Sequence, residues 1–382
     1  MALRPSEITL YQPRHSLVES SDRSPTGVAS PLPSAARYIP SLDGIRAVSF
    51  MMVFATHAGA NTFISGDFGV TVFFFLSGFL ITTLMRSEFD RNGSVNIRHF
   101  WLRRALRILP PFYLVALAAT LLALILYPPG TVYAPAMTAE VLFYANYWGI
   151  YGINREAPGT GVVWSLAVEE QFYLLFPLLY ISIQKMRVPR SGQAWLLWGL
   201  CALILAWRCV LVMALHSDST RIYIATDARV DSVLFGCALA VWSNPVLDEP
   251  TGSPGLWKFL LLPAALAALL ICFLFQGPVF RETWYFSIQG AALTLVFIAA
   301  IRFHTWPLFR FLNWRPVVFI GTLSYSLYLV HDVLLRAVAR LWPLSHAWQR
   351  AVISLAASII AAWVISVLVE RPCARLRKRL IH

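Results

Sequence analysis

The alternation of apolar and polar segments along the chain has the length scale of a lipid bilayer. Apolar stretches, separated by polar loops, recur from residue 42 to residue 369. A helix of about 20 apolar residues is long enough to cross the hydrocarbon core of a membrane. The pattern therefore predicts an all-α, polytopic integral membrane protein with about ten transmembrane helices, at residues 42–60, 68–86, 108–127, 168–184, 193–215, 228–243, 256–276, 284–301, 317–342 and 348–369.

Composition supports this interpretation and excludes a water-soluble fold. Of the 382 residues, 58% are hydrophobic and 13% are charged, which is about half the charged share of an ordinary soluble domain. Residues 1–38 are rich in Ser, Pro and charged side chains, so we expect a disordered tail there. The transmembrane domain is expected at residues 39–373, followed by a basic cytoplasmic tail at 374–382.

The basic residues are distributed unevenly between alternate loops. When the amino terminus is placed in the cytoplasm, the loops on that side carry most of the Arg and Lys, whereas the opposite loops carry only Arg155, Arg221 and Arg281. Cytoplasmic loops are enriched in basic residues, so both termini are expected to be cytoplasmic. The formal charge of +12 thus reports topology, and we expect no nucleic-acid partner.

The cysteines do not form a metal-binding pattern. Their number, five, is odd, and no Cys-x-x-Cys spacing occurs. Cys201, Cys209, Cys237 and Cys272 lie within apolar segments, where a free thiol packs as a small apolar side chain. We therefore expect buried structural thiols and no metal site.

Three ionisable residues share one face of the first apolar segment. On an α-helix, Asp43, Arg46 and His57 lie within about 60° of one another. A charge at bilayer depth costs at least about 2.5 kcal/mol, so this face is expected to point toward protein or a wet cavity. His57 lies about 21 Å along the axis from Asp43, past the midplane. Its imidazole suits proton transfer near neutrality, although a hydrogen bond across helices is an alternative role.

Two acids open the fourth apolar segment. We expect Glu170 to be stabilised near a helix amino terminus by the macrodipole. Its neighbour Glu169 points in another direction and could orient an imidazole or hold an arginine. Trp164 precedes them, at the end of an aromatic-rich external segment, 128–164, that either covers a cavity or anchors at the membrane interface.

Further ionisable residues occur at depth in later segments. Arg229 and Asp231 open the sixth segment, and Arg208 lies inside the fifth. Substrate binding is one interpretation, and ion pairing between helices is the other. His331 and Asp332 lie in the ninth segment, and Asp332 is followed four residues later by an arginine that could neutralise it locally.

A basic amphipathic stretch precedes the third segment, at residues 98–110. Arg103, Arg104 and Arg107 are expected on one polar face of this stretch. Such a face could anchor to anionic lipid headgroups. It could equally grip the phosphates of a ligand, because guanidinium groups match phosphate oxygens. Charge alone leaves both possibilities open.

In these residues the chain resembles a known family, the acyltransferase-3 group of polytopic membrane acyltransferases. The resemblance covers about residues 38 to 373, and its motifs follow one another in the family's order. They are Leu42-Asp43-Gly44-Ile45-Arg46-Ala47 with His57, the segment 69–81, Arg98-His99-Phe100 through Arg107-Ile108-Leu109-Pro110, the segment 164–173, Arg229-Val230-Asp231, the segment 324–331 and Glu370-Arg371-Pro372.

The resemblance implies a ten-helix core that takes an acyl group from cytoplasmic acyl-CoA and delivers it to a hydroxyl group. Acetyl-CoA is the expected co-substrate, and no bound cofactor is expected. The acceptor would be a carbohydrate, a lipid-linked glycan or a small molecule. His57 matches the first-helix histidine proposed to be catalytic, and Glu169 matches the acid of the W-S-L-x-V-E motif. The arginine-rich stretch matches the region linked to CoA binding.

These residues lead to a mechanistic hypothesis. His57 would act as general base on the acceptor hydroxyl, with Glu169 or Asp43 fixing its tautomer and Arg46 meeting the oxyanion or a CoA phosphate. An acyl-histidine relay on the same residues is an alternative. The donor-binding candidates are Arg86, His99, Arg103, Arg104 and Arg107, and the substrate-binding candidates are Trp164, Arg229, Asp231 and His331.

Other classes of function remain open on the sequence. In a transporter or flippase, the intramembrane His, Asp, Glu and Arg side chains would form a proton or substrate relay. A binding or scaffold protein with a decayed active site is a third possibility. The arginine-rich composition favours a bacterial protein of the cytoplasmic membrane. The acceptor, the acyl chain length and the oligomeric state are not specified by the sequence.

Overall fold

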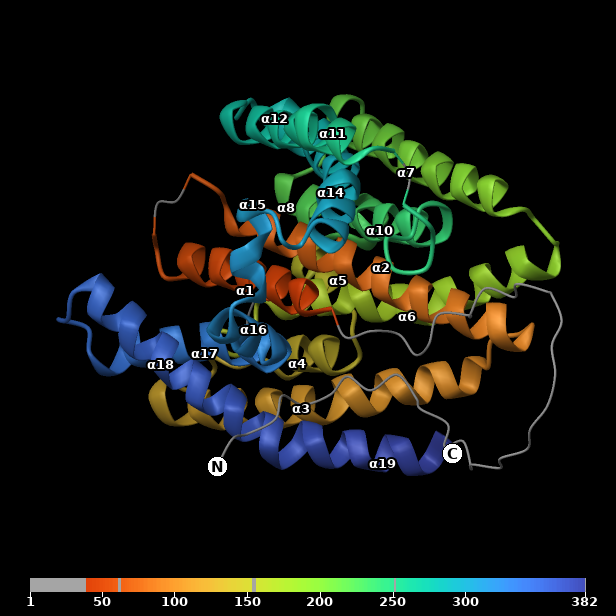
Figure 1. Ribbon diagram of the computed structural model, residues 1–382. Coiled ribbons are helices and arrows are strands. Elements are labelled where there is room, and N and C mark those ends of the chain that lie inside the picture. Colours follow the sequence, from red (N-terminus) through yellow and green to blue (C-terminus); the bar gives the residue numbers. More distant parts are fainter. Residues whose placement is uncertain (1–38, 61–62, 153–155, 251, 382) are drawn as a thin grey trace, which may run out of the picture.

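The computed structural model describes residues 39–60, 63–152, 156–250 and 252–381, and within these ranges every regular element is a helix (Figure 1). The predicted tail at 1–38 and Arg155 lie outside the described residues.

Each predicted apolar segment lies on a helix or a group of consecutive helices. The helices run back and forth, so that successive long helices alternate in direction (Figure 1). The long helices are α1 (Pro40–His57), α2 (Gly66–Asn92), α3 (Ile97–Leu126), α6 (Val163–Lys185), α7 (Arg190–Met213), α10 (Asp231–Trp242), α12 (Leu262–Leu274), α14 (Trp284–Arg302), α17 (Ser324–Leu341) and α18 (Ala347–Ile365).

Short helices connect or extend these elements. The residues predicted as a basic tail continue α18 as helix as far as residue 381. The short elements are α4 (Ala134–Val141), α5 (Ala145–Tyr151), α8 (Ser219–Ile224), α9 (Thr226–Arg229), α11 (Pro254–Leu256), η1 (Trp257–Leu261), α13 (Pro278–Glu282), α15 (Pro307–Arg310), η2 (Phe311–Asn313), α16 (Arg315–Thr322), η3 (Ser366–Glu370) and α19 (Arg371–Ile381).

Membrane-crossing helices are present, but fewer than ten meet a test of length and apolar composition. Seven helices of the described chain pass it, and eight pass if α16 and α17 form one bent span. The helices α1 and α10 are not among them. The count of ten spans and the orientation of the termini therefore remain predictions.

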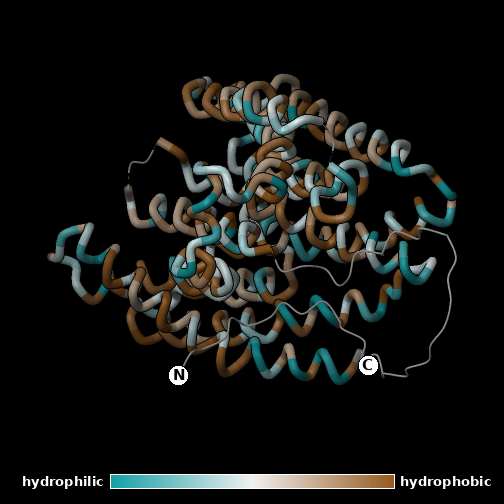
Figure 2. The backbone as a smooth tube through the Cα atoms, in the orientation of Figure 1, coloured by the Kyte–Doolittle hydropathy of each residue, from teal (hydrophilic) through white to brown (hydrophobic). Residues whose placement is uncertain are grey.

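The helices form an inner and an outer set. In the most apolar stretches of α2 and α14, 72% of the residues are buried inside the protein. The corresponding share is 22% for α7 and for the continuous helix that runs through α18 and α19. Leu124 on α3 and Leu203 on α7 are exposed, as is typical of a lipid-facing surface. Polar residues gather where α3 begins and α19 ends (Figure 2).

Glycine allows α2 and α10 to cross in close contact. A Cβ atom at Gly236 would lie 2.0 Å from the carbonyl oxygen of Phe75, and one at Gly78 would lie 2.0 Å from that of Val233. Only residues without a side chain permit backbones to approach this closely. This crossing holds α10 inside the bundle, with every side chain from Asp231 to Val241 buried.

The ninth predicted segment, 317–342, is not one continuous helix. Helices α16 and α17 meet at an angle of 75°. Gly321 in α16 packs against the backbone of Asp43 in α1, where a Cβ atom would lie 1.9 Å from the carbonyl oxygen. This docking of α16 on α1 turns the chain, and the helix then restarts at Ser324.

Candidate active site

Two histidines from distant parts of the chain meet at one end of the bundle. His57 is the last residue of α1, and His331 lies on α17. Nδ1 of His57 is 2.8 Å from Nε2 of His331, and the two rings lie edge to edge in nearly parallel planes, with centroids 5.1 Å apart. The His331 side chain is fully buried, whereas His57 is exposed. The pair therefore links the protein interior to its surface.

The backbone of α17 fixes the tautomers of both rings. Nδ1 of His331 is 2.8 Å from the carbonyl oxygen of Tyr328. A carbonyl oxygen only accepts hydrogen bonds, so Nδ1 of His331 donates and Nε2 of the neutral ring accepts. Nδ1 of His57 must then be the donor to His331. Nε2 of a neutral His57 is left with a lone pair, which is the form that a general base requires.

The partner of His57 differs from the one predicted. We expected Glu169 or Asp43 to orient its imidazole, and the structure instead places His331 there. The reason is the packing of α1 beside α17, which runs in the same direction and brings the two imidazoles to the same depth. His331, predicted as a substrate-binding residue, is thus placed to position His57.

A strip of polar side chains leads from the histidines along α17. Tyr325, Tyr328 and His331 are three residues apart and share one helix face. The hydroxyl groups of Tyr328 and of Ser165 on α6 are 2.7 Å apart. Tyr325 donates a hydrogen bond of 2.8 Å to the carbonyl oxygen of Ile108 on α3. The strip therefore lies where α3, α6 and α17 meet.

Glu169 lies beside this strip. Its Oε1 accepts a hydrogen bond of 2.6 Å from the hydroxyl group of Ser77 on α2, and its charge acts electrostatically on Tyr328. Its hydrogen-bond partner is thus Ser77 of α2 and not an imidazole of the histidine pair.

The position of the two acids within α6 differs from the prediction. The helix begins at Val163, so Glu169 and Glu170 lie in its second turn rather than at its amino terminus. The macrodipole acts mainly on the first turn, and the role predicted for Glu170 on that basis is wrong. Oε1 of Glu170 is buried and has no hydrogen-bond partner among the described residues.

Arginines from three helices gather near the start of the strip. Arg107 on α3 is exposed, and its charge acts on Arg46 of α1 and on Arg377 of α19. Arg46 also forms an ion pair of 2.5 Å with Asp43. No carboxylate pairs with Arg107 within the described ranges. This group, called the arginine cluster below, therefore carries an excess of positive charge.

Two other arginines of the basic stretch, Arg103 and Arg104, contact protein groups. Arg103 forms an ion pair of 2.9 Å with Glu88, and the guanidinium of Arg104 lies 5.0 Å from the centre of the Tyr173 ring. His99 is half-buried in the first turn of α3, where its backbone N–H donates to the side chain of Asn96.

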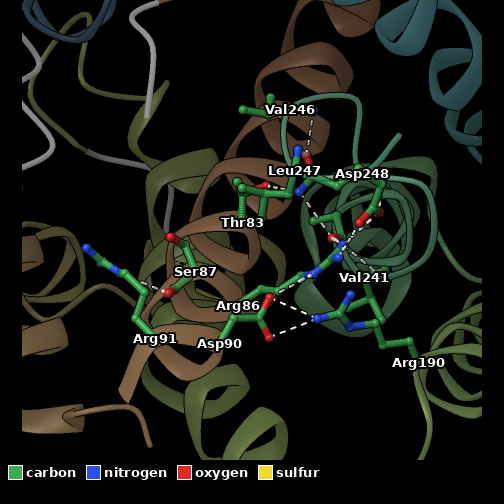
Figure 3. A network of polar contacts seen from close by, with 12 residues as sticks. Thr83, Arg86, Ser87, Asp90, Arg91, Arg190, Val241, Val246, Leu247 and Asp248 are labelled. Atoms are coloured by element: carbon green, nitrogen blue, oxygen red, sulfur yellow. Dashed lines mark hydrogen bonds and ion pairs between the residues drawn. The ribbon is translucent and has the colours of Figure 1, made fainter. Parts of the chain in front are cut away.

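Arg86 belongs to an ionic network at the end of α2 (Figure 3). It is buried, and its guanidinium binds the carboxylate of Asp248, with one contact of 2.9 Å, and the carbonyl oxygen of Ala240. Asp90 and Arg190 continue the network at 2.9 Å. Burial raises the pKa of Asp248, but the hydrogen bonds from Arg86 outweigh it and hold that pKa below its usual range. Arg86 thus joins helices and is not available to a donor.

The pair Arg229 and Asp231 is not formed. Asp231 instead binds Arg208 of α7 in a fully buried bidentate ion pair, with contacts of 2.9 and 2.7 Å. Arg229 is also fully buried, 3.5 Å above the ring centre of Phe286 and 3.2 Å from the hydroxyl group of Thr71. Ion pairing between helices, the alternative considered above, therefore explains Asp231. Arg229 remains a substrate-binding candidate.

Some residues of the site were not singled out from the sequence. Ser77 and Tyr328 lie within the motifs that carried the family resemblance, and Tyr328 is one helical turn before His331. Arg377 lay in the predicted tail, where nothing indicated a helix packed on α3. Periodicity identified the faces but not the facing helix.

No metal centre is indicated by the described residues. No group of three or more His, Cys, Asp and Glu side chains in the described ranges could hold a metal ion. All five cysteines are free thiols, three of them buried.

Comparison with known proteins places the chain in a family. The family described as acyltransferase domain matches residues 39–367. The chain is 30% identical over 306 residues to the O-acetyltransferase OatA of Staphylococcus aureus (strain NCTC 8325 / PS 47), which covers 77% of this chain and 50% of that protein. It is 29% identical over 356 residues to the peptidoglycan O-acetyltransferase OatA of Listeria monocytogenes, covering 88% and 56%. No solved structure gives a significant match.

The fold and the site define an integral membrane protein with a polar site enclosed by helices. The match over most of its length shows that the chain belongs to the acyltransferase-3 family, and its relatives place it in a bacterial cell membrane. The chain spans about half the length of the curated relatives it matches.

Proposed function

We propose that the protein is a membrane O-acyltransferase, and specifically an O-acetyltransferase that uses cytoplasmic acetyl-CoA. Membership of the acyltransferase-3 family and two relatives named as O-acetyltransferases support the reaction class. The observation that carries the proposal is the contact of 2.8 Å between His57 and His331. It leaves Nε2 of His57 as a base on the exposed side of the pair.

The proposed chemistry is a direct transfer. Nε2 of His57 takes the proton of the acceptor hydroxyl while the oxygen attacks the thioester carbonyl. The carbon–sulfur bond then breaks, and the CoA thiolate takes up the proton held by His57. The hydrogen bond from Nδ1 to His331 stabilises the imidazolium form of His57 in between. A well-placed base is commonly worth about 10² to 10⁴ in rate.

The arginine cluster is the proposed site for the phosphates of the donor. Arg46, Arg107 and Arg377 come from three helices, and Arg107 repels each of the other two in the absence of a ligand. A polyanion relieves this repulsion, and guanidinium groups bind phosphate in a planar, bidentate geometry. The strip through Tyr325 and Tyr328 would then lead from the phosphates to the histidines.

The proposed acceptor is a carbohydrate. One relative is named as a peptidoglycan O-acetyltransferase, and polysaccharides carry the free hydroxyl groups that the reaction consumes. A lipid-linked glycan or another hydroxyl compound would use the same chemistry.

The direct test is thiol release from acetyl-CoA by the purified protein in the presence of peptidoglycan fragments. We expect release that depends on the acceptor and falls at least about 100-fold in His57→Ala. His304→Ala is the matched control, because His304 lies in the loop between α14 and α15, away from the pair, and we expect it to retain activity.

Two experimental outcomes would contradict the proposed reaction or its mechanism. Transport of an acceptor without thiol release under any acceptor would favour the transporter or flippase class. A radiolabelled acetyl group trapped on the protein, and lost in His57→Ala, would replace direct transfer by an acyl-histidine relay.

A further inference from the structure

A cavity separate from the histidine pair lies among the short helices that follow α3. Its volume is about 120 Å³, and it is lined by side chains of α4, α5 and α6, with Trp148 and Trp164 among them. By this measure one water needs about 10 to 15 Å³, so the cavity holds several. Thr220 and Gly161 at its rim are exposed, which opens it to solvent.

The two tryptophans give the cavity flat apolar walls. Trp164 is held by ring contacts with Tyr223 at 4.8 Å and Phe74 at 6.1 Å, and Trp148 packs against Tyr133 at 6.3 Å. Rings fixed in this way lose little entropy when a ligand stacks on them. Flat ligands with C–H faces, such as pyranose rings, fit indole surfaces of this kind.

Two carboxyl groups face the same space. Glu140 is buried, at 3% exposure, and accepts a hydrogen bond of 2.5 Å from Thr160. Glu156 is half-buried, and a Cβ atom at Gly161 would lie 3.3 Å from its Oε1, which places this carboxyl group at the rim. Both residues line the cavity.

The protonation of Glu140 gives the cavity both donors and acceptors. Burial raises its pKa to about 8, the hydrogen bond from Thr160 opposes this, and the negative charge of Glu156 raises it further. At neutral pH Glu140 therefore keeps its proton, and a neutral carboxyl group both donates and accepts. Paired hydroxyl groups need this combination, whereas a metal ion needs ionised ligands.

The cavity adjoins the histidine pair through one stretch of loop. Gly159 packs on α17 directly after His331, with a Cβ position 2.4 Å from the Val333 backbone. Thr160, the next residue, bonds to Glu140 on the cavity side. A chain bound in the cavity and extending past this loop would bring a neighbouring unit toward His57.

We propose that this cavity binds one pyranose ring of a saccharide acceptor, stacked on Trp148 and Trp164 and hydrogen-bonded to Glu140 and Glu156. The inference rests on the proposed function for the identity of the bound chain as acceptor. Its binding step can be measured without turnover.

The experiment is isothermal titration of the purified full chain with a tetramer of N-acetylglucosamine. We expect binding by the wild type, a loss of at least about 10-fold in affinity in Trp148→Ala, and a smaller loss in Glu156→Gln, which is isosteric and half-exposed. Trp195→Ala is the matched control, because Trp195 is 75% exposed on α7.

The outcomes separate this inference from the proposed function. Binding that is absent in the wild type, or equal in the wild type and both pocket variants, would overturn the saccharide site even if thiol release occurs. Binding of choline instead of the saccharide, dependent on Trp148, would make the cavity a cation site and also overturn it. Saccharide binding that depends on Trp148 without thiol release would support the site and count against the proposed reaction.

Discussion

The hydrogen bond between the two histidines is compatible with two roles for His331. It either orients the imidazole of His57 or accepts a proton from it, and two variants separate these roles. His331→Gln keeps an acceptor for Nδ1–H of His57 but cannot take a proton, whereas His331→Leu removes the acceptor. If His331 only positions His57, we expect kcat/KM to fall by about 10-fold or less in the Gln variant and by about 100-fold in the Leu variant. The measurement is the pH profile of thiol release for both proteins.

Equal losses in the two variants would contradict a positioning role. They would show instead that the proton moves on to His331, and the acidic limb of the pH profile would then disappear in both. The wild-type KM for acetyl-CoA should persist in either variant, because the arginine cluster is untouched.

Glu140 makes stability depend on pH with a definite sign. Its pKa is about 8 in the folded protein against an ordinary value of 4.5, so between these values the folded state holds a proton that the unfolded chain has released. Its stabilising contribution is complete below pH 4.5 and is lost as the pH rises to about 8. We expect Glu140→Gln to melt at a higher temperature than the wild type at pH 8 and to show a weaker pH dependence.

Thermal melting in detergent between pH 5 and pH 8 checks this. Glu249→Gln is the control, since Glu249 is exposed in the loop after α10, and its melting curve should follow the wild type. Parallel pH dependence in Glu140→Gln and the wild type would show that Glu140 is ionised in the folded protein.

At the residue scale the sequence singled out ionisable side chains within the membrane but did not identify their partners. An ionisable side chain at membrane depth is conspicuous, so His57, Glu169 and Arg229 were found. Their partners lie on helices far away in the chain, as with His331 and Ser77. Helical periodicity gives a residue's direction from its own axis but not which helix stands opposite.

At the scale of elements, the crossing of α2 and α10 depends on the absence of side chains. A Cβ atom at Gly236 would lie 2.0 Å from a carbonyl oxygen of α2, whereas at Gly199 on α7 nothing lies within 4 Å. Gly236→Ala should destabilise the protein by about 1 to 3 kcal/mol through overpacking. Gly199→Ala should be neutral or slightly stabilising, because Ala favours a helix over Gly.

Thermal unfolding of the two variants in the same detergent compares them directly. A melting temperature for Gly236→Ala equal to that of Gly199→Ala would mean that α2 and α10 are not in backbone contact. Because α10 also carries Asp231, which is tied to Arg208, loosening the crossing should also reduce activity.

Apolar periodicity predicted where helices occur more reliably than where they begin or bend. Each of the ten predicted segments lies on helix. The early start of α6 at Val163 and the 75° bend before α17 were missed. Both depend on tertiary contacts, such as Gly321 against Asp43, and polar residues within a span hide a helix start from hydropathy.

At the scale of the whole molecule, the apolar character and length of a helix do not determine how deeply it is buried. Helix α10 has 12 residues, about 18 Å at 1.5 Å per residue, which is too short to cross about 30 Å of hydrocarbon. Its buried side chains contact other helices rather than lipid. Helix α1 is likewise largely buried and carries Asp43 and Arg46. Inner helices can therefore be short or polar, which explains why fewer than ten pass a test based on length and apolar composition.

Successive long helices run in opposite directions. The side of the membrane on which a given loop lies can therefore be predicted without knowing the exact number of spans. Leu344, between α17 and α18, is 100% exposed, and Ser94, between α2 and α3, is also exposed. The loops lie at opposite ends of the bundle, and the basic residues place the second one inside. A membrane-impermeant maleimide should therefore label Leu344→Cys in intact cells and Ser94→Cys only after permeabilisation.

The parent protein supplies the background labelling, since its five cysteines are buried or half-buried. The reverse labelling pattern would invert the topology and place the arginine cluster outside, where no cytoplasmic acyl-CoA could reach it.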